Sequence, residues 1–157
     1  MAPAVRFRSA VALLGRFPAL AGVDLEVRAG EIVLLQGGNG AGKTSLLRAC
    51  AGLVQVVSGE AAVLGHDLRA DRRAVRRRVG LLGHAGSLYD DLTAADNLRF
   101  AVRAAGGDPA SVDPTLARLG IEGRLRRTPV GRLSAGQRRR VALAAVVARA
   151  PELWLLD

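Results

Sequence analysis

The chain is organised around one glycine-rich stretch, Gly37-Gly38-Asn39-Gly40-Ala41-Gly42-Lys43-Thr44, which is followed by Ser45. An apolar run at residues 32–35 precedes it and predicts a buried parallel strand, and the apolar positions of residues 46–50 after it predict a helix. Strand, loop and helix in this order form the setting that a Gly-x4-Gly-Lys-Ser/Thr phosphate-binding loop requires.

The residue types of this stretch suit a polyphosphate. Glycines allow backbone N–H groups to close on phosphate oxygens, and the start of the following helix adds its free N–H groups. Lys43 supplies a compact charge for the β- and γ-phosphates, while the hydroxyl of Thr44 suits Mg²⁺. Lys43 is also the only lysine among 23 basic side chains, so an ordinary glycine-rich turn is the weaker interpretation. We therefore expect residues 37–45 to bind a nucleotide.

Composition limits the possible classes of protein. The 157 residues predict one domain, 1–157, and half of them are hydrophobic, which suffices for a core. One cysteine and no apolar leader favour a reducing, cytoplasmic setting. The longest apolar run, residues 141–148, is too short to cross a bilayer, so no transmembrane segment of its own is expected.

Arginine clusters carry most of the net charge of +9. They could mark nucleic acid, an anionic membrane surface or an acidic partner, or they could be solvated helix faces. Only five aromatic residues are present, one Tyr, one Trp and three Phe, so the stacking platforms of single-strand binders are missing. Direct nucleic-acid binding is therefore disfavoured.

Local patterns predict the other elements of the first half. Strands are expected at residues 5–14, 23–27 and 61–64, with turns at Ala29-Gly30 and at residues 58–60. Residues 71–78 predict a short basic helix, and residues 79–82 predict an apolar strand after it.

Helices dominate the second half. Thr93 and Asp96 have the spacing of a capping box, and the helix that they start should end at Gly106. Asp113-Pro114 should start another helix, which Gly120 ends. Residues 93–130 are therefore expected to form a small helical insert. Ser134 should cap a helix over residues 135–150.

Residues 153–157 predict a last, buried strand, and the carboxylate of Asp157 stands at its C-terminal end. Asp157 is placed where a P-loop NTPase has its second Mg²⁺-coordinating group, which predicts Thr44 and Asp157 as the metal-binding pair. The two histidines, His66 and His84, and the lone Cys50 lack the spacing of a zinc site. Cys50 is expected in the core.

The stretch Leu133-Ser134-Ala135-Gly136-Gln137 resembles the Leu-Ser-Gly-Gly-Gln signature of ATP-binding cassette (ABC) ATPases. The order of motifs over residues 5–157 is similar to that family's too. The resemblance implies an α/β P-loop NTPase fold with a mixed N-terminal β-subdomain, a parallel core sheet and a helical subdomain. It also implies ATP and Mg²⁺ as cofactors, with Lys43 and Asp157 as catalytic residues. A second ABC domain should pair head to tail, so that residues 133–137 meet the γ-phosphate of the partner in trans.

Within that family, the chain resembles the haem-exporter ATP-binding subunits of cytochrome c maturation. This narrower resemblance rests on Leu82-Gly83-His84, residues 92–100, residues 133–144 and residues 153–157. It implies a peripheral ATPase on the cytoplasmic face of the cell membrane, with integral membrane subunits docking near residues 84–91 and the helical insert. His84 stands where most ABC domains have Gln, which predicts a catalytic role for it; the alternative is a loop imidazole without one.

Departures from the family pattern limit these expectations. The family's catalytic Glu would follow Asp157, so the chain is interpreted as truncated, able to bind MgATP and a poor ATPase alone. The adenine-stacking position aligns with Leu14, and Phe17 is the alternative, as is no stacking by either. Other functions stay open: another ABC exporter, of drugs or lipids, or a soluble ABC ATPase acting on ribosomes or DNA. A P-loop kinase outside the ABC family is disfavoured by the stretch at 133–137.

Overall fold

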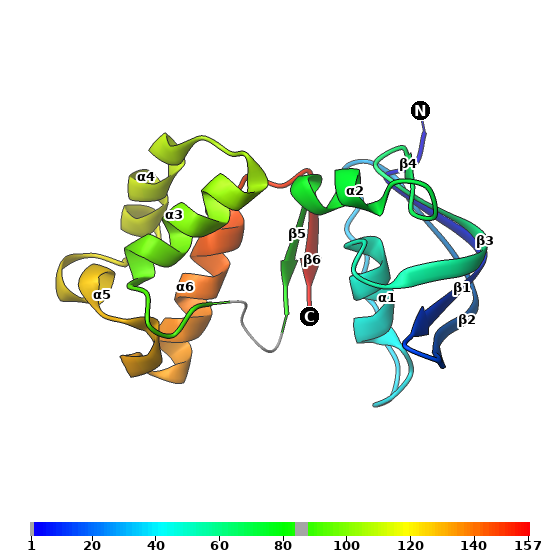
Figure 1. Ribbon diagram of the computed structural model, residues 1–157, viewed down its shortest axis with the longest axis horizontal. Coiled ribbons are helices and arrows are strands. Elements are labelled where there is room, and N and C mark those ends of the chain that lie inside the picture. The colour runs from blue at the N-terminus through cyan, green and yellow to red at the C-terminus, as the bar shows by residue number, and fades with distance from the viewer. Residues whose placement is uncertain (1, 84–87) are drawn as a thin grey trace. The chain divides into compact units, whose positions relative to one another are not determined.

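The structure is a computed structural model that describes residues 2–83 and 88–157 (Figure 1). The chain divides into two compact units. The N-terminal unit runs to Leu81 and includes Asp157, and the helical unit comprises Leu82–Leu156. Each unit is described by itself below.

An antiparallel sheet of four strands forms the frame of the N-terminal unit. Its strands are β1 (Val5–Leu14), β2 (Phe17–Val27), β3 (Gln55–Val63) and β4 (His66–Asp67), in the order β2-β1-β3-β4. Val5 of β1 lies opposite Val27 on one side and Val63 on the other. The strands predicted from residue 5 and from residue 23 are confirmed, and β2 begins earlier, at Phe17.

A bulge interrupts β1 at Ser9, which has a φ of 45°. The Ser9 N–H donates to the carboxylate of Asp24 at 2.7 Å instead of to a ladder partner. Gly59 of β3, with a φ of 76°, lies against the carbonyls of Arg8 and Ser9. The turn predicted at residues 58–60 is wrong, because a glycine inside a strand can also accommodate a bulge in the neighbouring strand.

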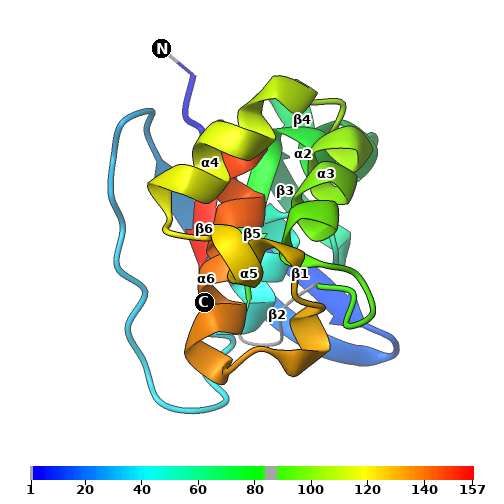
Figure 2. The same ribbon diagram turned by 90° about the vertical axis from the view of Figure 1, so that its left-hand side faces the viewer.

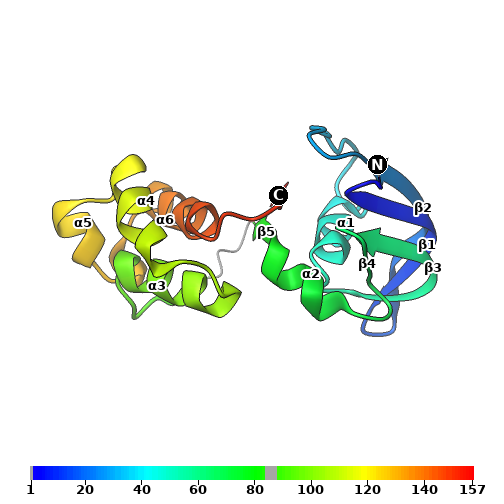
Figure 3. The same ribbon diagram turned by 90° about the horizontal axis from the view of Figure 1, so that it is seen from above.

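Helix α1 (Lys43–Cys50) packs against β2 and β3 (Figure 3). It buries Ala49 and Cys50 and ends at Ala51, after which Gly52 has a φ of 68°. Burial raises the pKa of the Cys50 thiol to about 12, so the thiol is neutral at physiological pH. Helix α1 and its glycine stop are as predicted, and Cys50 is a core residue.

Residues 32–35 do not form the predicted buried strand. They belong to a long irregular loop between β2 and α1, which Figure 2 shows in light blue to cyan. Ile32 is 98 % exposed and Leu34 is 78 % exposed. A parallel strand needs hydrogen-bonded neighbours at its edges and cover on its faces. The described part of the chain pairs no strand with this run, so its apolar character alone does not bury it.

Helix α2 (Arg72–Arg78) leads into β5 (Val79–Leu82), as predicted. The Arg76 Nε donates to the carbonyl of Gly52 at 3.0 Å. Arg78 donates to the carbonyl of Leu64 at 3.1 Å and lies 2.7 Å from the Nε2 of His66. Part of this basic cluster therefore ties loops of the N-terminal unit together.

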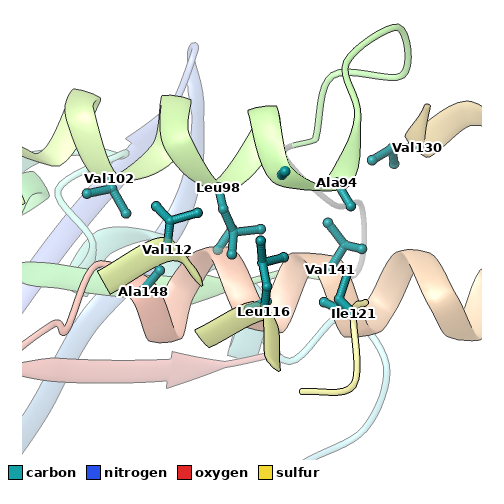
Figure 4. Close-up of a cluster of buried hydrophobic side chains, with 12 residues drawn as sticks. Ala94, Leu98, Val102, Val112, Leu116, Ile121, Val130, Val141 and Ala148 are labelled. Carbon is teal, nitrogen blue, oxygen red and sulfur yellow. The ribbon is translucent and has the colours of Figure 1, made fainter. Parts of the chain in front are cut away.

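The described residues of the helical unit form the helices α3 (Ala94–Ala105), α4 (Val112–Arg118), α5 (Gly123–Arg127) and α6 (Ala135–Ala148). Short 3₁₀ turns occupy residues 109–111 and 130–132. Helices α3, α4 and α6 contact one another (Figure 1) around a core in which Leu98, Leu116 and Ile121 are fully buried (Figure 4). Helix α4 starts at Val112, so Pro114 is its third residue and not its first.

Side chains cap the two longest helices. Thr93 accepts from the N–H of Asp96 at 3.1 Å and thereby caps α3. Hydrogen bonds from the side chains of Thr93 and Arg99 hold the pKa of Asp96 below its ordinary value. Ser134 accepts from the N–H of Gln137 at 3.2 Å, while the Gln137 side chain accepts from the N–H of Ser134 at 3.0 Å. This reciprocal capping box fixes the first turn of α6.

The last strand, β6 (Leu153–Leu156), forms a second sheet with β5. Leu155 is buried, whereas Trp154 and Leu156 are exposed, so the prediction of a buried strand holds for one residue of these three. No helix in the described residues is long and apolar enough to span a bilayer.

We predict that Gly59→Ala destabilises the protein more than Gly65→Ala. Both glycines have a positive φ, and strain of this kind costs about 1–2 kcal/mol for any other residue. A Cβ at Gly59 would collide with the carbonyl oxygen of Ser9, whereas one at Gly65 meets nothing within 4 Å. Overpacking should add about 1–3 kcal/mol at Gly59 alone. Urea unfolding of both variants measures the difference, and equal losses would contradict this description of the bulge.

We also predict that Ser134→Ala lowers the stability of the helical unit by about 1 kcal/mol, because α6 loses its cap. Ser134→Asp keeps an oxygen that can accept from the N–H of Gln137, so its stability should stay near that of the unaltered chain. Amide hydrogen exchange in the first turn of α6 measures the effect. If the alanine and aspartate variants exchange equally fast, the capping box contributes nothing.

Candidate functional site

The glycine-rich loop reaches α1 through three glycines with positive φ. Gly37, Gly40 and Gly42 have φ values of 154°, 80° and 90°. Gly42 is the N-cap of α1 in a left-handed conformation, and no side chain caps the helix. The N–H groups of the first turn are therefore available to an external acceptor such as a phosphate oxygen.

Lys43 closes the loop on itself. Its Nζ donates to the carbonyl of Gly37 at 2.8 Å and to that of Gly38 at 2.7 Å. Both acceptors are neutral backbone groups, so the positive charge is positioned without being neutralised. At Gly37, a Cβ would lie 3.2 Å from the Cβ of Ala41, which shows how tightly the loop is wound.

Thr44 and Asp157 meet in the N-terminal unit. The Thr44 hydroxyl donates to the Asp157 carboxylate, with both oxygens at 3.0 Å. Asp157 is exposed, and Thr44 is partly exposed. A hydroxyl and a carboxylate at this separation are hard oxygen ligands, the type that Mg²⁺ prefers. The fold thus brings together the predicted metal-binding pair, although its two residues are far apart in the sequence.

The stretch Leu133–Gln137 lies at the start of α6, in the helical unit. Ser134, Ala135 and Gly136 are exposed, whereas Leu133 packs against the core of the unit. The Ser134 oxygen accepts one hydrogen bond in the capping box, which leaves its O–H free to donate. The stretch therefore offers a hydroxyl and exposed backbone at a helix N-terminus.

The sequence-predicted residues thus fall into two groups. Residues 37–45 and Asp157 belong to the N-terminal unit, and residues 133–137 belong to the helical unit. His84 lies outside the described residues. Leu14 and Phe17 are opposite each other at the end of the β1–β2 hairpin, where Phe17 is 80 % exposed.

Sequence reasoning missed the residues that hold the loop before α3. Asn97 is buried in α3, and its side-chain amide donates to the carbonyls of Tyr89, Leu92 and Thr93 at 3.0–3.2 Å. Its side-chain oxygen accepts from the N–H of Tyr89 at 2.8 Å. An asparagine within an apolar helical stretch was the available signal.

Two arginines of α6 also went unassigned. Arg138 pairs with the carboxylate of Asp90 at 2.7 Å, and Arg139 donates to the carbonyl of Gly83 at 2.6 Å. They connect the helix that begins at Ser134 to both sides of the segment 84–87. Among the described residues, no cluster of three or more His, Cys, Asp or Glu side chains could hold a metal ion.

Comparison with known proteins identifies the family and the fold of the chain. The chain is 41 % identical to the cytochrome c biogenesis ATP-binding export protein CcmA of Cupriavidus pinatubonensis, over 99 % of this chain and 69 % of that protein. The fold matches the ATP-binding cassette MJ0796, solved as a dimer bound to ADP and Pi, with a TM-score of 0.85 at 24 % identity over 98 % of this chain and 73 % of the other. It also matches a bacterial Atm1-family ABC exporter solved with ATP bound, with a TM-score of 0.84 at 27 % identity over 99 % of this chain and 29 % of the other.

The chain spans about two thirds of the length of the curated relatives that it matches. The ABC transporter family profile matches residues 20–157, which include the glycine-rich loop, the stretch at 133–137 and Asp157. The expected α/β fold of an ABC-type P-loop NTPase is confirmed by the solved cassettes. The chain therefore belongs to the ABC transporter ATP-binding family.

Proposed function

We propose that this chain binds MgATP at residues 37–45 and Asp157 and that it takes part in ATP hydrolysis that drives export in cytochrome c biogenesis. One observation carries the binding step: the Thr44 hydroxyl donates to the Asp157 carboxylate directly beside the loop that Lys43 closes. The export step is supported by the printed name of the relatives, which are ATP-binding export proteins of cytochrome c biogenesis.

Nucleotide binding follows from the geometry of the loop. The first-turn N–H groups of α1 receive phosphate oxygens, and the glycines allow the backbone to approach them closely. Lys43 adds its charge where the β- and γ-phosphates lie. Its hydrogen bonds to the carbonyls of Gly37 and Gly38 hold the ammonium beside the loop before the nucleotide arrives, which lowers the entropy cost of positioning it.

The Thr44 and Asp157 oxygens fit Mg²⁺ because the ion binds proteins through one or two oxygen ligands and completes its shell with water and phosphate. When bound, the ion neutralises charge on the β- and γ-phosphate oxygens. The residues of this chain hold it: Thr44 contributes its hydroxyl oxygen, and Asp157 contributes a carboxylate oxygen.

A second ABC domain completes the proposed site. Ser134 and the exposed backbone of Ala135 and Gly136 present hydrogen-bond donors at the N-terminus of α6. In a head-to-tail pair, these donors would meet the γ-phosphate bound by residues 37–45 of the other copy. The dimeric cassette among the solved relatives supports this pairing.

Integral membrane subunits are the proposed partners, which would place the protein at the cytoplasmic face of the membrane. Tyr89 and Phe100 form an edge-on pair with ring centroids 4.9 Å apart, and both rings are about half exposed. Exposed aromatic side chains of this type are enriched where proteins dock. Docking near residues 84–91 and a catalytic role for His84 belong to the same proposal.

Haem is the proposed cargo. The alternative is that the chain belongs to another ABC exporter, which transports drugs or lipids. A soluble ABC ATPase acting on ribosomes or DNA is the other alternative, and the relatives named as export proteins favour the transporter.

We predict that Lys43→Ala weakens MgATP binding roughly 10- to 150-fold, the range expected for losing hydrogen bonds to a charged group. Thr44→Val and Asp157→Asn should instead abolish the enhancement that Mg²⁺ gives, with little effect on binding of metal-free ATP. Fluorescence titration with a labelled ATP, with and without Mg²⁺, measures both effects.

The matched controls are Thr44→Ser, which keeps the hydroxyl, and Asp91→Asn, which removes an exposed carboxylate of the helical unit. Both should retain the Mg²⁺ enhancement. If Thr44→Val and Asp157→Asn retain it as well, the proposed metal site is wrong.

We further predict that residues 1–157 can replace the matching region of the CcmA protein of Vibrio cholerae, to which the chain is 41 % identical. The chimaera should restore c-type cytochromes to a strain that lacks the relative, measured by haem staining, and the same chimaera with Lys43→Ala should not. A chimaera that is abundant and binds ATP, yet restores no cytochrome, would refute the cytochrome c assignment and leave the ATP-binding step standing.

A further inference from the structure

A basic cavity lies in the helical unit, and none of the residues that line it is assigned to the nucleotide. Its volume is about 670 Å³, and it is lined by residues of one short segment: Gly123, Arg124, Arg127, Thr128, Pro129 and Arg132. Cavities of roughly 300–1,000 Å³ are the size that holds small ligands. We call it the α5 cavity.

Three guanidinium groups line this cavity, and none of the six lining residues is acidic. Within the described residues, Arg124, Arg127 and Arg132 have no ion pair and no side-chain hydrogen bond. Their neighbour Arg126 differs, because it pairs with the carboxylate of Asp113 and is not among the lining residues. The segment thus neutralises one of its arginines and leaves three like charges around a hollow, where their mutual repulsion is unfavourable.

The backbone of the segment places the three arginines around the cavity, and all three residues are exposed. Arg124 and Arg127 are three residues apart on α5 and therefore share one face. The Thr128 hydroxyl donates to the carbonyl of Arg124 at 2.8 Å and closes the end of the helix. Arg132 ends the 3₁₀ turn at residues 130–132, whose first residue, Val130, is fully buried.

We propose that the α5 cavity binds a multiply charged, phosphate-bearing anion. Arginine donates through a planar fork that matches pairs of phosphate oxygens, and it stays charged at any physiological pH. Three such groups around one cavity suit an anion with two or more negative charges. This site is separate from the loop at residues 37–45 and does not depend on the proposed ATPase function. The anion can be the headgroup of an anionic lipid or a soluble phosphate compound.

The test is an NMR titration of the full chain with inorganic pyrophosphate, followed through backbone amide shifts. Pyrophosphate also suits the loop at residues 37–45, and residue-resolved shifts separate the two sites. We expect saturable shifts at residues 123–132. The cavity variant, with Arg124→Gln and Arg127→Gln, should weaken that binding by about tenfold, since it loses hydrogen bonds to a charged ligand.

The control variant, with Arg103→Gln and Arg118→Gln, removes the same charge from exposed positions of the same unit outside the cavity. Its binding should change by less than about twofold, because salt screens distant exposed charges. The Arg127→Lys variant keeps the positive charge but lacks the planar guanidinium group, so it should bind pyrophosphate with intermediate affinity. It replaces the cavity variant in the test if that variant unfolds. The absence of saturable shifts at residues 123–132, or equal weakening by both double variants, would overturn the proposal.

Vesicle sedimentation then identifies the source of the anion. Vesicles of phosphatidylcholine alone are compared with an equal mixture of phosphatidylcholine and phosphatidylglycerol. If the unaltered chain and the control variant sediment with the mixture and the cavity variant does not, the ligand is a lipid headgroup. If all three sediment equally, or none does, the cavity takes a soluble phosphate compound.

Discussion

Two hydrogen bonds from one ammonium group close the glycine-rich loop. Lys43 is the first residue of α1, so the helix fixes where its side chain starts, and the carbonyls of Gly37 and Gly38 fix where it ends. Helix α1 in turn rests on β2 and β3. The bulged antiparallel sheet therefore serves as the platform that sets the position of the charge, although no strand of it carries a residue assigned to the phosphates.

The two helix N-termini of the proposed site are prepared in different ways. No side chain caps α1, so its first-turn N–H groups await an external acceptor. Helix α6 has a capping box, which satisfies the N–H of Gln137 internally and leaves the Ser134 hydroxyl as a donor. A ligand at α1 would replace water on bare backbone groups, whereas a ligand at α6 meets a turn that is already rigid. An anion therefore satisfies more uncapped N–H groups at the N-terminus of α1 than at that of α6.

Local chemistry predicted the elements whose limits are set by their own side chains. The N-cap residues Thr93 and Ser134 and the glycine stop after α1 could be identified because caps act within one turn. Elements that depend on distant partners could not be identified from local sequence. The apolar run at 32–35 looks like a strand, yet the described chain gives it no ladder partner. The bulge at Ser9 depends on Asp24, which is also distant in sequence. The Thr44–Asp157 pair is the exception, because the order of motifs in P-loop NTPases predicts it although the two residues are far apart.

Arginine illustrates why charge runs in a sequence are hard to interpret. Arg78 and Arg139 donate to backbone carbonyls and hold loops, so their charge supports structure. Arg126 and Arg138 pair with carboxylates from other segments. Exposed pairs of this type contribute only about 0–1 kcal/mol, but they remove the positive field that an approaching anion would sense. Binding capacity therefore resides in arginines that the fold leaves without a partner, and adjacent positions in one run, such as those on α5, can differ in this respect.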